Sequence, residues 1–89
     1  MMHQYKLLLQ GFLMDRILLY RSANQFTQEQ MAELLHISPR SYFDLEHGKY
    51  GLSALTLIFF LLILSKTDVL NLLDEFQNLV DRAGKDDVA

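Results

Sequence analysis

An 89-residue chain is long enough for one domain and lies near the lower size limit at which a single hydrophobic core supports a fold. Its hydrophobic fraction of 51% excludes a disordered chain, and the absence of cysteine excludes a disulfide framework, a thiolate nucleophile and a cysteine-ligated zinc site. The longest uninterrupted apolar run, residues 57–64, is far shorter than the roughly 20 residues of a membrane-spanning helix, so we expect a soluble cytoplasmic protein.

The net charge of −3 is unevenly distributed along the chain. Residues 1–50 carry five basic and five acidic side chains, whereas residues 51–89 carry three basic and six acidic ones. The acidity therefore belongs to the second half, and the first half is neutral. Because neutralisation of phosphates usually dominates affinity for DNA, this balance does not favour a nucleic-acid binder.

Helical periodicity is the pattern that recurs along the chain, and it predicts five helices and no strand. The first helix covers about residues 5–23, where apolar side chains are spaced to share one face. These side chains are Leu9, Phe12, Leu13, Ile17 and Tyr20. Glycine is unfavourable inside a helix, so Gly11 is a candidate break or kink, and residues 1–10 are a candidate separate arm.

Two helix-start signals follow in close succession. Thr27 begins the second helix, because its hydroxyl can accept from the Gln30 amide while the Gln30 side chain reaches back, which is a capping box. Ser38 is the N-cap of the third helix, and Pro39 takes the first helical position, where no backbone amide is needed. The short spacing between the two starts predicts two short helices joined by a tight turn.

The turn between these helices falls at His36, a position that commonly needs a positive φ, which histidine tolerates better than most side chains. Gly48 can adopt the left-handed conformation that ends the third helix. Residues 27–48 therefore have the pattern of a helix-turn-helix, and the third helix is the candidate for reading DNA.

The fourth helix begins at Ser53 and contains the apolar run 57–64, and Ser65 caps a fifth helix. A helix that is apolar on every side must be covered on every side, which an 89-residue monomer can scarcely do. We therefore expect the helices of residues 53–83 to form both core and a homodimer surface. The candidate core or dimer residues are Leu57, Phe59, Phe60, Leu61, Leu64, Leu73 and Phe76. We predict a single domain over residues 1–83 and a disordered tail over residues 84–89.

The segment from about Ile17 to Leu64 resembles the Cro and lambda-repressor type of helix-turn-helix domain, also called the xenobiotic-response-element family. The matching positions are Ile17, Tyr20, Arg21, Phe26, Thr27, Gln28, Glu29, Ala32, Leu35, Ile37, Ser38, Leu45, Glu46 and Gly48. The resemblance implies an all-α, five-helix bundle of the lambda-repressor-like type. It also implies a salt bridge between Arg21 and Glu46, whose carboxylate at the end of the third helix needs a nearby cation.

The resemblance further implies which side chains face double-stranded DNA. The base-reading candidates are Arg40, Pro39, Phe43 and Asp44. The candidates for contacting or positioning phosphates are Gln28, Ser38, Ser41, His47, Lys49 and Tyr50. Arg40 is the best base reader among them, because a guanidinium can bond the O6 and N7 atoms of guanine together.

The sequence is compatible with two functions. The first is a sequence-specific, DNA-binding transcriptional regulator of the Cro/repressor type that binds an operator as a homodimer through its third helix. The alternative is a protein-interaction or dimerisation module that keeps the helix-turn-helix scaffold with weak or no DNA binding. The neutral charge of the motif, the acidic Asp44 and the apolar Phe43 favour the alternative.

Other function classes find no support in the sequence. His3, His36 and His47 have no spacing typical of a metal site, and no phosphate-binding loop or nucleophile elbow is present. We therefore expect no enzyme activity, no cofactor and no metal, and no small-molecule ligand is evident.

Overall fold

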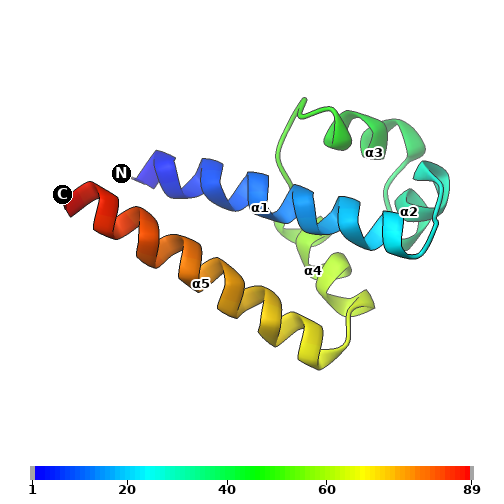
Figure 1. The fold of residues 1–89 in the computed structure, drawn as a ribbon. Coiled ribbons are helices and arrows are strands. Elements are labelled where there is room, and N and C mark those ends of the chain that lie inside the picture. Colours follow the sequence, from blue (N-terminus) through cyan, green and yellow to red (C-terminus); the bar gives the residue numbers. More distant parts are fainter. Residues whose placement is uncertain (1, 89) are drawn as a thin grey trace.

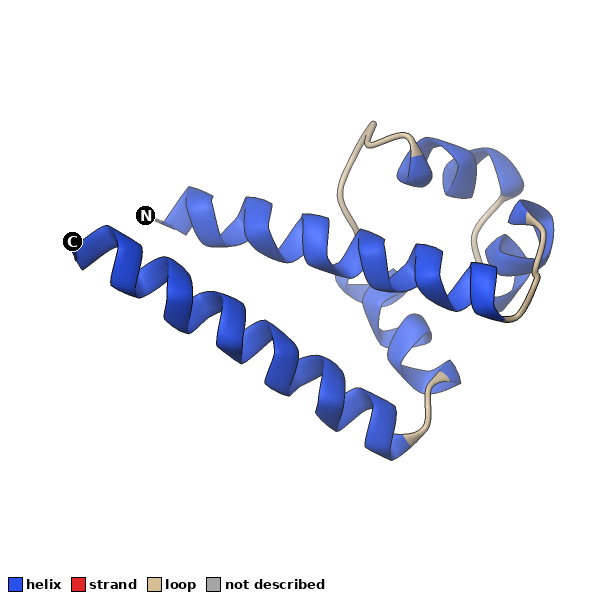
Figure 2. Ribbon diagram, in the orientation of Figure 1, coloured by secondary structure: helices blue, strands red, loops and turns tan. Residues whose placement is uncertain are grey.

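The computed structural model describes the backbone of residues 2–88 and the side chains of residues 4–84. Within that range the chain forms five helices and no strand, as the sequence predicts (Figures 1 and 2). The helices are α1 (Met2–Ala23), α2 (Gln28–Leu34), α3 (Pro39–Glu46), α4 (Ala54–Ile63) and α5 (Lys66–Val88). The expected all-α, five-helix fold is thereby confirmed.

The two long helices, α1 and α5, lie side by side, and the short helices α2 and α3 sit at the end of α1 that is distant from the N-terminus (Figure 1). The rings of Phe12 and Phe76 pack at 5.4 Å between α1 and α5. Arg16 and Glu75 form an ion pair of 2.9 Å across the same contact. None of the helices among the described residues is both long and apolar enough to cross a bilayer.

The first helix is continuous through Gly11, so this candidate position does not break it, and residues 2–10 are the first turns of α1 rather than a separate arm. A glycine inside a helix costs only about 1 kcal/mol relative to alanine. The buried side chains of Phe12, Leu13 and Ile17 follow Gly11 directly, and their burial holds the helix on the core. Met1 lies outside the described residues.

The last helix also differs from the sequence-based expectation. We expected a disordered tail over residues 84–89, whereas α5 continues through residues 84–88; residue 89 lies outside the described residues. An established helix gains one hydrogen bond for each residue added, and residues 84–88 contain no proline that would stop it. Gly84 lies near α1, since a Cβ placed on it would be 3.8 Å from the Tyr5 hydroxyl.

The capping signals have the predicted geometry. The Thr27 hydroxyl accepts from the Gln30 amide at 3.1 Å, and the Thr27 amide donates to the Gln30 side chain at 2.9 Å. The Ser38 hydroxyl accepts from the Ser41 amide at 3.0 Å, and Pro39 occupies the first helical position of α3. Each cap satisfies amides at a helix start that have no partner inside the helix.

The turns use left-handed backbone at three positions. His36, between α2 and α3, has φ +60°, and Gly48, after α3, has φ +71°, as expected from the sequence. Gln25, between α1 and α2, has φ +56°, which the sequence did not indicate. Ser53 and Ser65 cap the two C-terminal helices by accepting from the amides of Thr56 and Asp68.

The core lies where α1, α3 and the start of α5 meet α2 and α4. Its buried apolar side chains are Phe12, Leu13, Ile17, Met31, Ala32, Leu35, Tyr42, Leu45, Phe60 and Leu72. Every helix thus contributes, with α1 and the α2–α3 pair supplying most of the residues. The fold therefore fixes α3 against α1 and α2 through buried surface.

The apolar helix α4 is covered on one side only. Of the candidate core or dimer residues, Phe60 is buried, and Leu57, Leu61, Leu64 and Phe76 pack half-buried against the core. Phe59 is half-buried, and its ring lies 4.3 Å from that of His36. Leu73 on α5 is exposed. Leu55, Ile58 and Leu62, which the sequence analysis did not single out, form an exposed stripe on α4.

Candidate nucleic-acid interface

The inner face of α3 is fixed by burial, and this decides which side chains face outward. Tyr42 and Leu45 are buried against the rest of the motif, together with Leu35 at the end of α2. Ala32 on α2 is also buried, and its small side chain permits the close approach of α2 and α3. Because a helix repeats every 3.6 residues, the opposite face of α3 is left exposed.

The carboxylate of Glu46, at the end of α3, joins three elements of the motif. It accepts from Arg21 of α1 through Nε at 2.7 Å and Nη2 at 3.3 Å, so the expected salt bridge is present and bidentate. It also accepts from Gln28 Nε2 at 2.8 Å and from the Tyr42 hydroxyl. Arg21 Nη1 donates to the Phe26 carbonyl at 3.2 Å. We call Arg21, Gln28, Tyr42 and Glu46 the Glu46 cluster.

Charge and burial act together in the Glu46 cluster. Burial by itself disfavours the Glu46 carboxylate, but hydrogen bonds from Tyr42, Gln28 and Arg21 outweigh it and hold the pKa of Glu46 below its ordinary value. Burial and the hydrogen bond to Glu46 raise the pKa of Tyr42. Burial opposes the charge of Arg21, yet the bond to Glu46 raises the pKa of Arg21. At neutral pH the cluster is a carboxylate held by a guanidinium and a phenol.

The cluster changes the role of Gln28. The sequence places Gln28 among the phosphate candidates, but its side-chain amide donates to the Glu46 carboxylate and is half-buried. One of its two N–H groups is thus occupied inside the protein. Gln28 therefore links the start of α2 to the end of α3 directly.

The outer face of α3 carries a second charge group, formed by Arg40, Asp44 and Lys49. The Arg40 side chain is 78% exposed, and its Nε lies 3.3 Å from Asp44 Oδ1. Lys49 Nζ lies 3.9 Å from Asp44 Oδ2. The Asp44 side chain is only 15% exposed. Asp44, a base-reading candidate from the sequence, thus lies mostly covered between two cations, while Arg40 extends into solvent.

The end of this face is apolar and aromatic. Phe43 is exposed, and its ring stacks on the His47 ring at 4.0 Å. His47 Nδ1 donates to the Phe43 carbonyl at 2.8 Å, because a carbonyl can only accept. These bonds fix the ring of His47 beside Phe43, and the two side chains form one exposed surface.

The hydroxyl candidates are partly engaged within the protein. The Ser38 hydroxyl donates to Ser41 Oγ at 2.9 Å in addition to its capping bond. The Tyr50 hydroxyl donates to the Ser41 carbonyl at 2.9 Å and so ties the loop after α3 to the body of that helix. Of the three, Ser41 keeps a hydroxyl hydrogen that no group of the described residues accepts. The ammonium hydrogens of Lys49 that do not point at Asp44 likewise have no acceptor among the described residues.

The residues that sequence reasoning missed lie outside this face. Leu55, Ile58 and Leu62 are exposed on α4, where every residue except Thr56 is apolar and the sequence gives no sign of which side is covered. Among residues 4–84, no three histidine or acidic side chains gather as a group that could hold a metal ion.

A family model described as a helix-turn-helix domain matches residues 15–75, which is more than half of the chain. The matched residues include all of α2, α3 and α4, the last part of α1 and the first part of α5. Searches of curated proteins and of solved structures found no match. The match agrees with the resemblance seen in residues 17–64 and with the capped helices observed around the motif. The chain belongs to the helix-turn-helix domain family.

Proposed function

We propose that the protein is a cytoplasmic transcriptional regulator of the Cro/repressor type that binds operator DNA with α3 in the major groove. The observation that carries this proposal is the outer face of α3, which no other part of residues 4–84 covers: Pro39, Arg40 and Phe43 are all exposed there. The Glu46 cluster and the buried side of α3 fix the orientation of that face. Helix-turn-helix domains insert their second motif helix into the major groove in this way.

Arg40 is the proposed base reader. Its side chain projects from the first turn of α3, the part of a recognition helix that reaches base edges. Lys49 and Ser41 are the proposed phosphate contacts, because each retains polar hydrogens toward solvent, whereas His47 donates its Nδ1 hydrogen to the Phe43 carbonyl. Pro39, Phe43 and Asp44 line the same face, with Phe43 suited to the methyl group of thymine.

We further propose that the regulator acts as a homodimer through the exposed apolar residues of α4 and α5. Leu55, Ile58 and Leu62 lie three and four residues apart on α4, and Leu70 and Leu73 are exposed near the start of α5. A monomer with one short reading helix offers few phosphate contacts, whereas a dimer places two such helices about 34 Å apart, one turn of DNA. Dimerisation therefore doubles the contacts without adding positive charge to the chain.

The DNA proposal is tested by selecting bound sequences from random duplexes with the full chain. We expect a preferred sequence, with Arg40→Ala costing about 1–3 kcal/mol at one base position and relaxing the preference at that position. Arg82→Ala, an exposed arginine of α5, is the matched control and should change neither. Selection of no sequence, or an equal effect of the two variants, would reject operator binding by α3.

The dimer proposal is tested by the mass in solution at micromolar concentration. We expect the dimer mass for the natural chain and the monomer mass for Leu62→Glu, because the Leu62 side chain is 71% exposed and its replacement leaves the core intact. Leu19→Glu, at an exposed leucine of α1, is the control and should remain dimeric. A monomer mass for the natural chain would dismiss the homodimer.

A protein-interaction module is the second candidate function. It is favoured by the pairing of Asp44 with both Arg40 and Lys49, which neutralises the outer face of α3, and by the exposed ring of Phe43. A salt titration separates the two functions. DNA binding loses affinity steadily as salt rises, whereas binding of a protein to an apolar face does not follow that slope.

A further inference from the structure

Two stacked aromatic rings lie at the end of the outer face of α3. The centroids of the Phe43 and His47 rings are 4.0 Å apart, with 24° between the ring planes. Phe43 is 42% exposed, and α3, all of which the structure describes, exposes no other large apolar side chain. We call Phe43 and His47 the aromatic pair. Side chains one turn apart share one side of a helix, so Phe43 faces outward together with Arg40, three residues before it.

The Phe43 ring is held in place within the protein. His47 Nδ1 donates to the Phe43 carbonyl at 2.8 Å, which fixes the imidazole to the backbone of the residue whose ring it contacts. Stacking covers one side of the Phe43 ring, and the rest of the ring stays open to solvent. A side chain that is already ordered loses little conformational entropy when it binds. The aromatic pair is therefore a small, preordered apolar surface.

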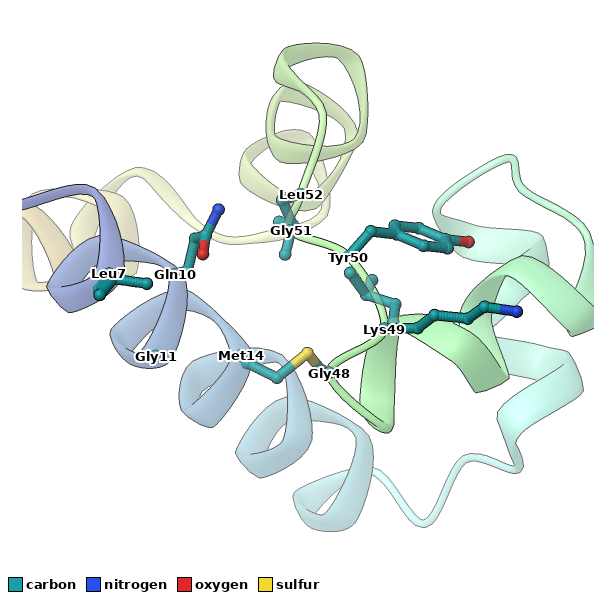
Figure 3. A pocket seen from close by; sticks show the side chains of 10 residues that line it. Leu7, Gln10, Gly11, Met14, Gly48, Lys49, Tyr50, Gly51 and Leu52 are labelled. Carbon is teal, nitrogen blue, oxygen red and sulfur yellow. The ribbon is translucent and has the colours of Figure 1, made fainter. Parts of the chain in front are cut away.

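The groups around the aromatic pair are polar and charged. Arg40 and Lys49 both contact the carboxylate of Asp44. Figure 3 shows Lys49 and Tyr50 extending from the loop after α3 on the side away from α1. A stable protein interface buries about 800 Å² on each partner around a hydrophobic core, which is far more than two rings supply. The size of the aromatic pair thus fits one small apolar group better than it fits a protein surface.

The base edges in the major groove of DNA offer few apolar groups. Among the four standard bases, thymine alone presents one there, its 5-methyl group, and cytosine carries the same group at the same position once it is methylated. Side chains three residues apart on a helix are separated by about 5–6 Å, and successive base pairs by about 3.4 Å. An apolar ring three residues after Arg40 therefore reaches a base within about two pairs of the one that Arg40 contacts.

We propose that the aromatic pair binds the 5-methyl group of an operator pyrimidine, thymine or 5-methylcytosine, within about two base pairs of the guanine that Arg40 contacts. This contact rests on the proposed function, because that function places α3 in the major groove. Phe43 touches the methyl group, and His47 positions the Phe43 ring. DNA affinity then depends on methylation wherever a cytosine occupies this position.

The test begins with the duplex that the full chain selects from random sequences, in which Arg40→Ala identifies the guanine. Each thymine is replaced in turn by deoxyuridine, which lacks only the methyl group, and affinity is measured by fluorescence anisotropy at constant salt. We expect one position near the guanine where the replacement weakens binding about fourfold, since burial of one carbon group contributes about 0.8 kcal/mol. At that position 5-methylcytosine should bind about fourfold more tightly than cytosine.

Variants connect the methyl effect to the aromatic pair. Phe43→Ala should bring the ratio of thymine to deoxyuridine affinity from about four to about one and leave the preference for guanine unchanged. His47→Ala should lower the ratio to about two, because the Phe43 ring loses its stacking partner, and His47→Phe should restore it, because a phenyl ring stacks in the same way. Leu19→Ala, at an exposed leucine of α1, is the control and should keep the natural ratio.

The outcomes separate this contact from operator binding itself. A selected duplex with no methyl-sensitive thymine within about two base pairs of the guanine would overturn the methyl contact and leave base reading by Arg40 in place. A ratio that Phe43→Ala does not change would have the same meaning. Selection of no sequence at all would reject the proposed function, and the methyl contact with it.

Discussion

Replacing Arg21 with methionine removes the cation that neutralises Glu46 and keeps an unbranched side chain on α1. The Glu46 side chain is only 7% exposed, so water is a poor substitute for the lost guanidinium. Loss of one partner from a fully buried ion pair costs about 3–5 kcal/mol. The Arg21 side chain is 28% exposed, and Tyr42 and Gln28 continue to donate to the carboxylate, so we expect a smaller loss of about 2–3 kcal/mol in the free energy of unfolding.

Urea unfolding at neutral pH, with linear extrapolation, measures this loss. Glu46→Gln keeps a hydrogen-bonding side chain and should cost about 1–2 kcal/mol, and the double variant should cost less than the sum of the single ones. Arg16→Met is the matched control, because the side chains of its 2.9 Å ion pair with Glu75 are 37% and 48% exposed, and its loss should cost no more than about 1 kcal/mol. If Arg21→Met costs no more than Arg16→Met, or the two changes are additive, the Glu46 cluster is not a coupled unit.

Four further outcomes follow from the same structure. The folded-state pKa of Glu46 is lowered, so its contribution to stability is complete above the ordinary carboxyl pKa and is lost as the pH falls through the folded pKa. Between about pH 7 and about pH 3, the urea midpoint of unfolding should therefore fall less in Glu46→Gln than in the natural chain. Gly11→Ala should raise the free energy of unfolding by about 1 kcal/mol, because Gly11 lies inside α1 and an added Cβ meets no atom within 4 Å. Gly48→Ala should lower the free energy of unfolding by about 1 kcal/mol, because Gly48 has φ +71°, which alanine adopts at a cost. Asp44→Asn releases Arg40 and Lys49 and should tighten DNA binding about fivefold in fluorescence anisotropy, provided that α3 binds DNA.

The features that the sequence predicts well are local ones. The caps at Thr27 and Ser38 depend on residues three positions apart, and the positive φ values at His36 and Gly48 depend on which side chains tolerate that conformation. Such signals are complete within one turn of chain. They fixed the start of α2 and of α3, and with them the expected outer face of the motif.

The features that the sequence does not reveal depend on distant packing. The continuity of α1 through Gly11 is decided by the burial of the residues that follow it, and this burial involves α3, α4 and α5. The uncovered side of α4 cannot be recognised when nearly every residue of the helix is apolar. Gln28 lies 18 residues from Glu46, so its role in the Glu46 cluster appears only when α2 and α3 are placed together.

The neutral charge of the first half of the chain has a different meaning once the side chains are placed. The outer face of α3 does not lack cations; Arg40 and Lys49 are present there and share the carboxylate of Asp44. The pairing of Arg40 with Asp44 joins an exposed guanidinium to a mostly covered carboxylate; a pair four residues apart on a helix surface contributes about 0.3–0.5 kcal/mol, whereas a bidentate contact between arginine and guanine contributes about 1–3 kcal/mol. If α3 binds DNA as proposed, a contact of this strength is enough to displace the pairing of Arg40 with Asp44. The pairing of Arg40 with Asp44 therefore lowers the affinity for DNA by less than one contact between Arg40 and a base would add. A neutral net charge is thus compatible with a helix that reads DNA.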